Sequence, residues 1–430
     1  MEDIFRIALQ DATKGTGTTT DNPLLPMQLS HVCSKWRDVA TNSPYLWTNV
    51  TVQFPTESTS HLIKLWLTRG RSLPVHVTIR QFAIVVTQQS VFEKLVELLA
   101  EHSHRWKSVS VELGSKLRPF VANAFASIKN LDRLAVVKIR FHVYQLWEPE
   151  GEDKSMDEIV RRLCAGRSLQ VFDYHTDGEL VGIPSLGSWA GLKKMSLRNC
   201  FINTDFFGGL RACRVLEELS LQYCNAQRTQ EVEEESKIEI PTLTTLQVGN
   251  SINVVQILMT LLVTPELRTL EIAYCGHEAT EEIMGATVNN LVRSQAQLHT
   301  FIYHDTLRDN EETFLTALSS TAFACIRKLD LHGSFTDEFA KFLMVPNQSG
   351  MEVLPNLTSL SLAVCAVRMA GLLKRMVASR FFRGTSSGTV AQLNELQLGI
   401  SRPHIHVRDT EGLEKLRNHG LKFGYKVSFS

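Results

Sequence analysis

Two pairs of histidines are the residues whose spacing most directly suggests chemistry. His102 and His104 flank one serine, and His404 and His406 flank one isoleucine. On a strand, residues i and i+2 share a face, so such a pair could hold a metal ion between two imidazoles. Because neither pair has a cluster of cysteines or carboxylates at ligand spacing beside it, we predict surface histidines, no metal site and no cofactor.

A glycine- and threonine-rich segment over residues 14–20 has a superficial similarity to a phosphate-binding loop. Its sequence, Lys-Gly-Thr-Gly-Thr-Thr-Thr, lacks the Gly-Lys-Ser/Thr ending and follows no predicted strand. We interpret it as a flexible connection. We predict that the chain is not an enzyme. The alternative is an active site made of residues that are scattered along the sequence and brought together by folding.

The composition is that of a globular protein without a dominant charge. The 430 residues are 43% hydrophobic, and 45 Lys and Arg are balanced by 45 Asp and Glu. A dedicated nucleic-acid binder would be basic in its contact domain, so we expect no nucleic-acid partner. The acidic N-terminus does not resemble a secretory signal, and the apolar segment Val254–Val263 is too short to cross a bilayer. We therefore expect a cytoplasmic or nuclear protein without a membrane partner.

A nine-residue pattern, Leu-x-x-Leu-x-Leu-x-x-Cys, recurs along the chain. Copies with a cysteine at the ninth position begin at Leu192, Leu216, Leu267 and Leu357. With weaker copies between them, successive starts lie 24 to 31 residues apart. Upstream, three further copies are predicted to begin at Trp106, Leu131 and Leu169. The pattern and its period resemble the leucine-rich-repeat signature.

The spacing of the repeat predicts its structure. Positions four and six alternate inward on a short strand, and the segments between copies, such as Val254–Val263 and Ala370–Phe382, supply outer helices. The cysteines at the ninth position, Cys200, Cys224, Cys275 and Cys365, are expected to be buried free thiols. We predict an α/β solenoid with parallel strands inside and helices outside, over residues 50–430.

Positions three, five and seven of each repeat point away from the core, onto the open side of the sheet. These positions are polar and carry both signs of charge, which suits a protein partner. Such a face can equally be an ordinary solvated surface. The predicted substrate-binding residues are Lys194, Arg198, Glu218, Gln222, Glu271, Lys328 and Asp330.

The N-terminal region has a different pattern. Leu29, Val32 and Trp36 lie on one apolar stripe at helical spacing, which predicts a single amphipathic helix ended by Pro44. The run V-C-S-K-W-R-D-V-A, followed by S-P-Y-L-W, resembles the second half of an F-box of the fungal type. Met1–Leu9 resembles the first F-box helix without its Leu-Pro start.

The resemblance implies a small helical module over residues 1–49 that docks onto a Skp-type adaptor and, through it, a cullin. The predicted adaptor-binding residues are Ile4, Phe5, Leu29, Val32, Trp36, Leu46 and Trp47. The chain would then be the substrate-recognition subunit of a Skp–cullin–F-box ubiquitin ligase, with the repeats binding an unknown protein substrate. The alternative is a leucine-rich-repeat interaction scaffold without a ligase role, its N-terminal helices serving as a cap.

Overall fold

The computed structural model describes residues 24–53, 55–81, 89–142, 154–177, 181–182, 189–226, 237–273, 280–304, 310–345, 352–365, 367–383, 390–399 and 406–426. The chain divides into two compact units, Met1–Asn199 and Cys200–Ser430. This division falls inside the repeat region. The predicted domain boundary between residues 49 and 50 stays a prediction, although the first described strand begins at Asn49.

Unit 1 begins with two short helices and continues as alternating strands and helices. Its sheet is parallel, in the order β1-β2-β3-β4-β5-β7. The elements are α2 (Leu25–Ser30), α3 (Ser34–Asn42), β1 (Asn49–Val52), α4 (Glu57–Arg69), β2 (Val75–Gln81), α5 (Gln89–Glu101), β3 (Trp106–Gly114), α6 (Arg118–Ala126), β4 (Val136–His142), α7 (Lys154–Leu163), β5 (Val171–Thr176), β6 (Val181–Gly182) and β7 (Lys194–Arg198).

Unit 2 repeats the same alternation. Its main sheet is also parallel, in the order β9-β12-β14-β15-β16-β17-β18-β19. The elements are β8 (Cys200–Ile202), α8 (Thr204–Ala212), β9 (Glu218–Gln222), β10 (Asn225–Ala226), β11 (Ile238–Glu239), β12 (Thr245–Gly249), α9 (Ile252–Leu261), β13 (Leu262–Val263), β14 (Thr269–Ala273), α10 (Thr280–Ser294), β15 (Thr300–His304), α11 (Glu311–Leu318), β16 (Lys328–Phe335), α12 (Asp337–Leu343), β17 (Ser359–Cys365), α13 (Leu372–Arg383), β18 (Glu395–Gly399), α14 (Val407–Asn418) and β19 (Lys422–Lys426).

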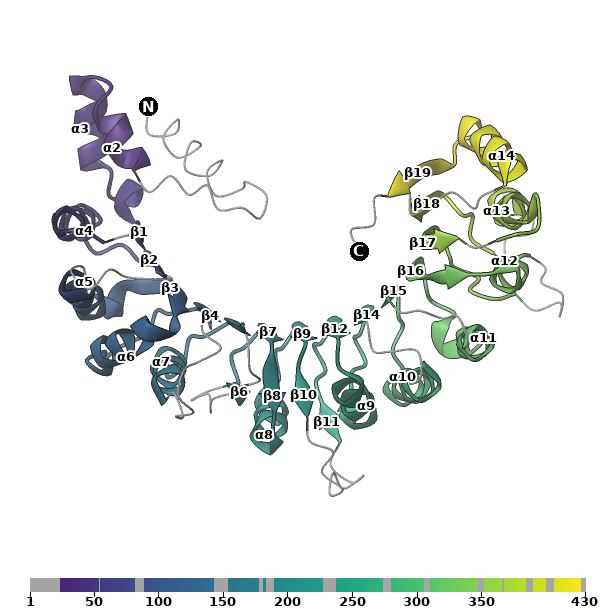
Figure 1. Ribbon diagram of the computed structural model, residues 1–430, viewed down its shortest axis with the longest axis horizontal. Coiled ribbons are helices and arrows are strands. Elements are labelled where there is room, and N and C mark those ends of the chain that lie inside the picture. The colour runs from purple at the N-terminus through teal and green to yellow at the C-terminus, as the bar shows by residue number, and fades with distance from the viewer. Residues whose placement is uncertain are drawn as a thin grey trace. The chain divides into compact units, whose positions relative to one another are not determined.

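The predicted α/β fold, with parallel strands inside and helices outside, is confirmed. Within each unit the strands lie side by side and the helices line one side of them (Figure 1). Equivalent repeat positions stack across neighbouring strands, as Leu219, Leu246 and Leu270 do, and their side chains are buried. The opposite side of each sheet, away from the helices, is called here the strand face of that unit.

The chain leaves the strand through a left-handed residue at the eighth position of the repeat. Asn199, Tyr223 and Asn250 have φ values of 56°, 54° and 58°. The cysteines that follow the first two, Cys200 and Cys224, are buried, as predicted, and are thiols rather than disulfide partners. Cys275 and the side chain of Cys365 lie outside the described residues.

The predicted single helix across Leu29 and Val39 is wrong. Helix α2 ends at Ser30, whose hydroxyl donates to the carbonyl oxygen of Met27 at 2.7 Å, and α3 begins only at Ser34. Cys33 between them is extended, with φ −159° and ψ 173°. A serine hydroxyl that bonds the backbone carbonyl three residues earlier competes with continuation of the helix, so apolar spacing alone predicted a helix that was too long.

Candidate functional site

Part of the predicted docking surface lies in the core. Leu46 and Trp47, in the 3-10 turn η1 (Pro44–Trp47), have buried side chains. The Trp47 indole Nε1 donates to the carbonyl oxygen of Ala40 at 2.8 Å, and its ring meets Trp66 edge-on with centroids 4.7 Å apart. These contacts join α3 to α4. The expectation that Leu46 and Trp47 face an adaptor is therefore corrected, because neither side chain is open to one.

Three other predicted docking residues remain accessible. Val32 lies in the turn between α2 and α3 with 60% of its surface exposed. Leu29 and Trp36 are half-buried on the two helices. Ile4 and Phe5 lie outside the described residues. Among residues 24–47 of this module, the large apolar side chains that are exposed are Val32 and Leu24, the latter at 47%.

A row of charged side chains crosses the strand face of unit 1. The row occupies the same register position on five adjacent parallel strands, which lie about 4.8 Å apart. From β2 to β7 the row is Arg80, Glu112, Arg140, His175 and Arg198. Because these side chains are close together on one face, they interact electrostatically with one another and with any molecule that binds there.

Glu112 organises the first half of this row. Its carboxylate accepts from Arg80 Nε at 2.7 Å and from His142 Nε2 at 3.1 Å, and Arg140 Nη1 lies 3.5 Å away. Partial burial by itself would raise the pKa of Glu112. The hydrogen bonds from His142 and Arg80, with the positive charges of Arg80 and Arg140, outweigh burial and hold this pKa below its ordinary value.

A chain of histidines and carboxylates continues the network. His142, which contacts Glu112 through Nε2, reaches Asp177 Oδ2 through Nδ1 at 2.6 Å. The other oxygen of Asp177 lies 2.8 Å from His175 Nε2. Charge-assisted contacts of this length fix side-chain orientation. The strand face of unit 1 is therefore an ordered polar surface.

The strand face of unit 2 carries a second polar cluster. Gln247 Nε2 donates to Glu271 Oε2 at 3.1 Å. His332 Nε2 lies 3.3 Å from Asp330 Oδ1, and its ring stacks on His304 with centroids 3.7 Å apart. Asp330, predicted on an open face, is in fact buried. The predicted residues Glu271 and Asp330 are close enough for their charges to interact.

The raised pKa of Glu271 predicts how this residue affects the stability of the fold. Burial raises the pKa of Glu271, and the Asp330 charge adds to this; the hydrogen bond from Gln247 and the charge of His332 act in the opposite direction. An acid with a raised pKa destabilises the fold at pH values where it is ionised. We therefore expect Glu271→Gln, which can still accept from Gln247, to raise the melting temperature at neutral pH.

The size of this stabilisation depends on pH. Below about pH 3, where the carboxyl is protonated in both the folded and the unfolded chain, the difference between Glu271→Gln and wild type should vanish. Thermal unfolding followed by circular dichroism at both pH values measures it, with Glu218→Gln on the same strand face as control. A variant less stable than wild type at neutral pH would show that this account of Glu271 is wrong.

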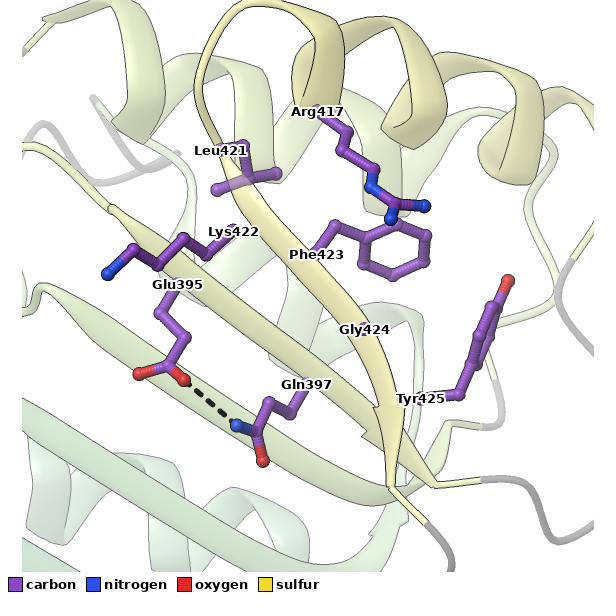
Figure 2. A pocket seen from close by; sticks show the side chains of 8 residues that line it. All are labelled: Glu395, Gln397, Arg417, Leu421, Lys422, Phe423, Gly424 and Tyr425. Carbon is purple, nitrogen blue, oxygen red and sulfur yellow. Dashed lines mark hydrogen bonds between the residues drawn. The ribbon is translucent and has the colours of Figure 1, made fainter.

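A hollow of about 560 Å³ lies at the last strand of unit 2. Arg417 from α14 and Tyr425 from β19 flank it, as Figure 2 shows. On the neighbouring strand β18, Gln397 Nε2 donates to Glu395 Oε1 at 2.9 Å. The hollow is thus lined by charged and aromatic groups at the end of the sheet.

The other predicted substrate-binding residues lie on the strand faces as expected but do not form one cluster. Lys194 and Arg198 are exposed at the two ends of β7. Glu218 and Gln222 are half-buried at the ends of β9, and Lys328 is exposed at the start of β16. Their role in binding stays a prediction.

One register error hid the part of the unit 1 network that lies on β4. The copy predicted to begin at Leu131 would turn Val136 inward, whereas the structure buries Val137 and Ile139. The true copy begins at Leu134, and its seventh position is Arg140. A shift by an odd number of residues moves every side chain of a strand to the opposite face, so the charged residues of β4 were assigned to the wrong side of the sheet.

The residues that suggested metal chemistry do not assemble a site. His102 precedes a 3-10 turn, Ser103–Arg105, and His104 lies within it, so the pair is not on a strand; their ring centroids are 6.4 Å apart. His406 caps α14 by accepting from the Arg408 amide, and His404 lies outside the described residues. Across the described ranges, no group of three or more His, Cys, Asp or Glu is placed to hold a metal ion. Within the same ranges, every helix is too short or too polar to cross a membrane.

Comparison with known proteins gives no family. No protein-family model and no curated protein matches the chain. Among solved structures, the chain is similar to the crystal structure of the Rad7 and Elc1 complex in yeast, with 12% sequence identity and a TM-score of 0.31. The similarity covers 84% of this chain and 87% of the other. Likeness at this level is too distant to carry an argument about function.

Proposed function

We propose that this chain is the substrate-recognition subunit of a Skp–cullin–F-box type ubiquitin ligase. In this proposal the N-terminal helical module binds a Skp-type adaptor and the strand faces bind a protein substrate. The observation that carries the substrate-binding half of the proposal is the ordered polar strand face of unit 1, which presents charged groups held by cross-strand contacts. A preorganised polar surface of this kind suits recognition of a protein by hydrogen bonds and charge.

The N-terminal module supports the adaptor half of the proposal. Helices α2 and α3 carry the sequence that resembles an F-box, and Val32 is exposed where the two helices meet. Trp47 anchors α3 to the first repeat helix, so the module has a fixed base. An exposed apolar side chain on a helical module that is packed against the repeats offers surface that a partner protein can bury.

The second candidate is an interaction scaffold without a ligase role. The polar strand faces fit this candidate equally well, whereas the exposed apolar group on the F-box-like helices favours the first. Binding to a Skp-type adaptor separates the two, because the scaffold has no need of it.

The adaptor contact can be tested by one charge placed at the exposed apolar position. We expect Val32→Asp to reduce co-purification of a Skp-type adaptor by about tenfold or more. The substitution replaces an apolar contact of the proposed interface by an unpaired carboxylate that the adaptor would have to bury. The readout is the amount of adaptor retained on the immobilised full chain.

Val407→Asp is the matched control, because Val407 is 66% exposed but lies on α14 in unit 2. It should leave adaptor binding unchanged. Equal retention of the adaptor by wild type and Val32→Asp, with both chains folded, would reject the assigned docking site.

A further inference from the structure

We infer that the strand face of unit 1 recognises an acidic segment of a protein partner, whose carboxylates bind along the line of Arg80, Arg140 and Arg198. This inference rests on the proposed function and names the class of substrate segment that the strand face selects. It commits to carboxylates of the partner chain as the bound groups.

The charge of this face is the first support. The cationic residues at its strand positions are Arg80, Lys138, Arg140, Lys194 and Arg198. The anionic residues on it are Glu112, Asp173 and Asp177. Cations therefore exceed anions even with the histidines neutral, which favours an acidic partner.

The corresponding face of unit 2 has the opposite balance. Its carboxylates at strand positions are Glu218, Glu271, Asp330 and Glu395, and its cations are Lys328 and Lys422. The same fold thus presents two differently charged faces within one chain. Charge selection is a property of the residues on unit 1, since the backbone arrangement is common to both units.

The positions of the arginines are the second support. Arg80, Arg140 and Arg198 lie on every second strand of the row, about 10 Å apart at the usual strand spacing. Glu112 holds Arg80 in place, while Arg140 touches Glu112 only through Nη1 at 3.5 Å and is 52% exposed. A guanidinium so placed can meet a carboxylate that arrives from solvent.

His175 lies between the last two arginines. Its ring is fixed by Asp177, and Arg140 and Arg198 both act on it electrostatically. A carboxylate placed between the two arginines would contact both cations at once. Asp173 and Asp177 stand nearby, so a dianionic phosphate would meet more repulsion than single carboxylates spread along a segment. The local charges therefore favour a carboxylate-rich segment.

Proton uptake should accompany this binding. Burial lowers the pKa of His175, as do the charges of Arg140 and Arg198, whereas Asp177 and Asp173 oppose the shift. A bound anion would raise this pKa and favour the charged ring. The other titratable or charged groups on this face and its neighbouring strands are His76, Arg80, Lys107, Glu112, Lys138, His142 and Lys194.

The test uses a fluorescein-labelled oligo-glutamate peptide and the full chain, with binding followed by fluorescence anisotropy at near-physiological salt. We expect the double variant Arg140→Gln and Arg198→Gln to bind the peptide roughly three- to tenfold more weakly than wild type. Binding to wild type should tighten between about pH 7.5 and pH 6, and His175→Gln should flatten this dependence. Arg140→Lys, which keeps the charge, should retain most of the affinity.

The matched control is the double variant Arg408→Gln and Lys415→Gln, which removes two exposed cations from helix α14 of unit 2, away from its strand face. It should leave peptide binding unchanged. Absence of peptide binding to wild type, or equal weakening by both double variants, overturns the inference. A serine-phosphorylated peptide that binds more tightly than oligo-glutamate at equal charge overturns the commitment to carboxylates. Adaptor retention, measured on the same proteins, reports separately on the proposed function.

Discussion

Replacing Arg380 by leucine is expected to destabilise unit 2 by about 3 kcal/mol or more. The Arg380 side chain on α13 is fully buried, and burial lowers the pKa of its guanidinium to about 10, so it remains charged at neutral pH. Its nitrogens donate to three carbonyl oxygens, those of Leu343 at 2.5 Å, Leu354 at 3.1 Å and Val353 at 2.6 Å. A leucine would leave these buried acceptors unsatisfied.

The measurement is chemical unfolding of the full chain followed by circular dichroism. Arg380→Leu should lower the denaturant midpoint of the transition that belongs to unit 2. Arg375→Leu, on the exposed side of the same helix, is the control and should change stability little. If both variants unfold at the same denaturant concentration, the hydrogen bonds from Arg380 to the carbonyls of Leu343, Val353 and Leu354 do not stabilise unit 2.

Replacing Trp47 by alanine is expected to cost about 3–5 kcal/mol, the usual range for a buried aromatic. The indole is fully buried, donates to Ala40 and packs against Trp66, and the Arg69 guanidinium lies 4.5 Å from its ring centre. The variant should loosen the N-terminal helices from the first repeats. Limited proteolysis within residues 24–47, together with the melting temperature, measures this loss.

Trp47→Phe should recover much of the packing while lacking the hydrogen bond to Ala40. Trp36→Ala is the second comparison, because Trp36 is only half-buried and should cost less stability. A Trp47→Ala protein that melts and resists protease as wild type does would contradict the packing described between α3 and α4.

The repeat could be predicted because its signal is periodic. Leucine at fixed positions predicted parallel strands and outer helices, and the structure has both. The helix predicted over Ala370–Phe382 is α13, Leu372–Arg383, whereas the segment Val254–Val263 ends its helix at Leu261 and continues as the short strand β13. The end of a helix depends on which backbone hydrogen bonds the next residues form, and apolar composition does not predict these bonds.

The strand faces were harder to predict than the core. Polar residues on an exposed strand follow no period of their own, so their assignment depended on locating each repeat, and the error at Leu131 hid Arg140. The contacts of His142 with Glu112 and Asp177 join β4 to β3 and to the residue that follows β5, and no local sequence pattern predicts these contacts. Arg380 was missed for a related reason, since a single arginine in an amphipathic helix is ordinarily exposed.

Affinity of the purified chain for a purified Skp-type adaptor, measured by isothermal titration calorimetry, tests the central claim most directly. The account predicts saturable one-to-one binding that Val32→Asp weakens by about tenfold or more and that Val407→Asp leaves unchanged. It also predicts that the double variant Arg140→Gln and Arg198→Gln binds the adaptor as wild type does. No measurable binding of the adaptor to the folded wild-type chain would contradict the account.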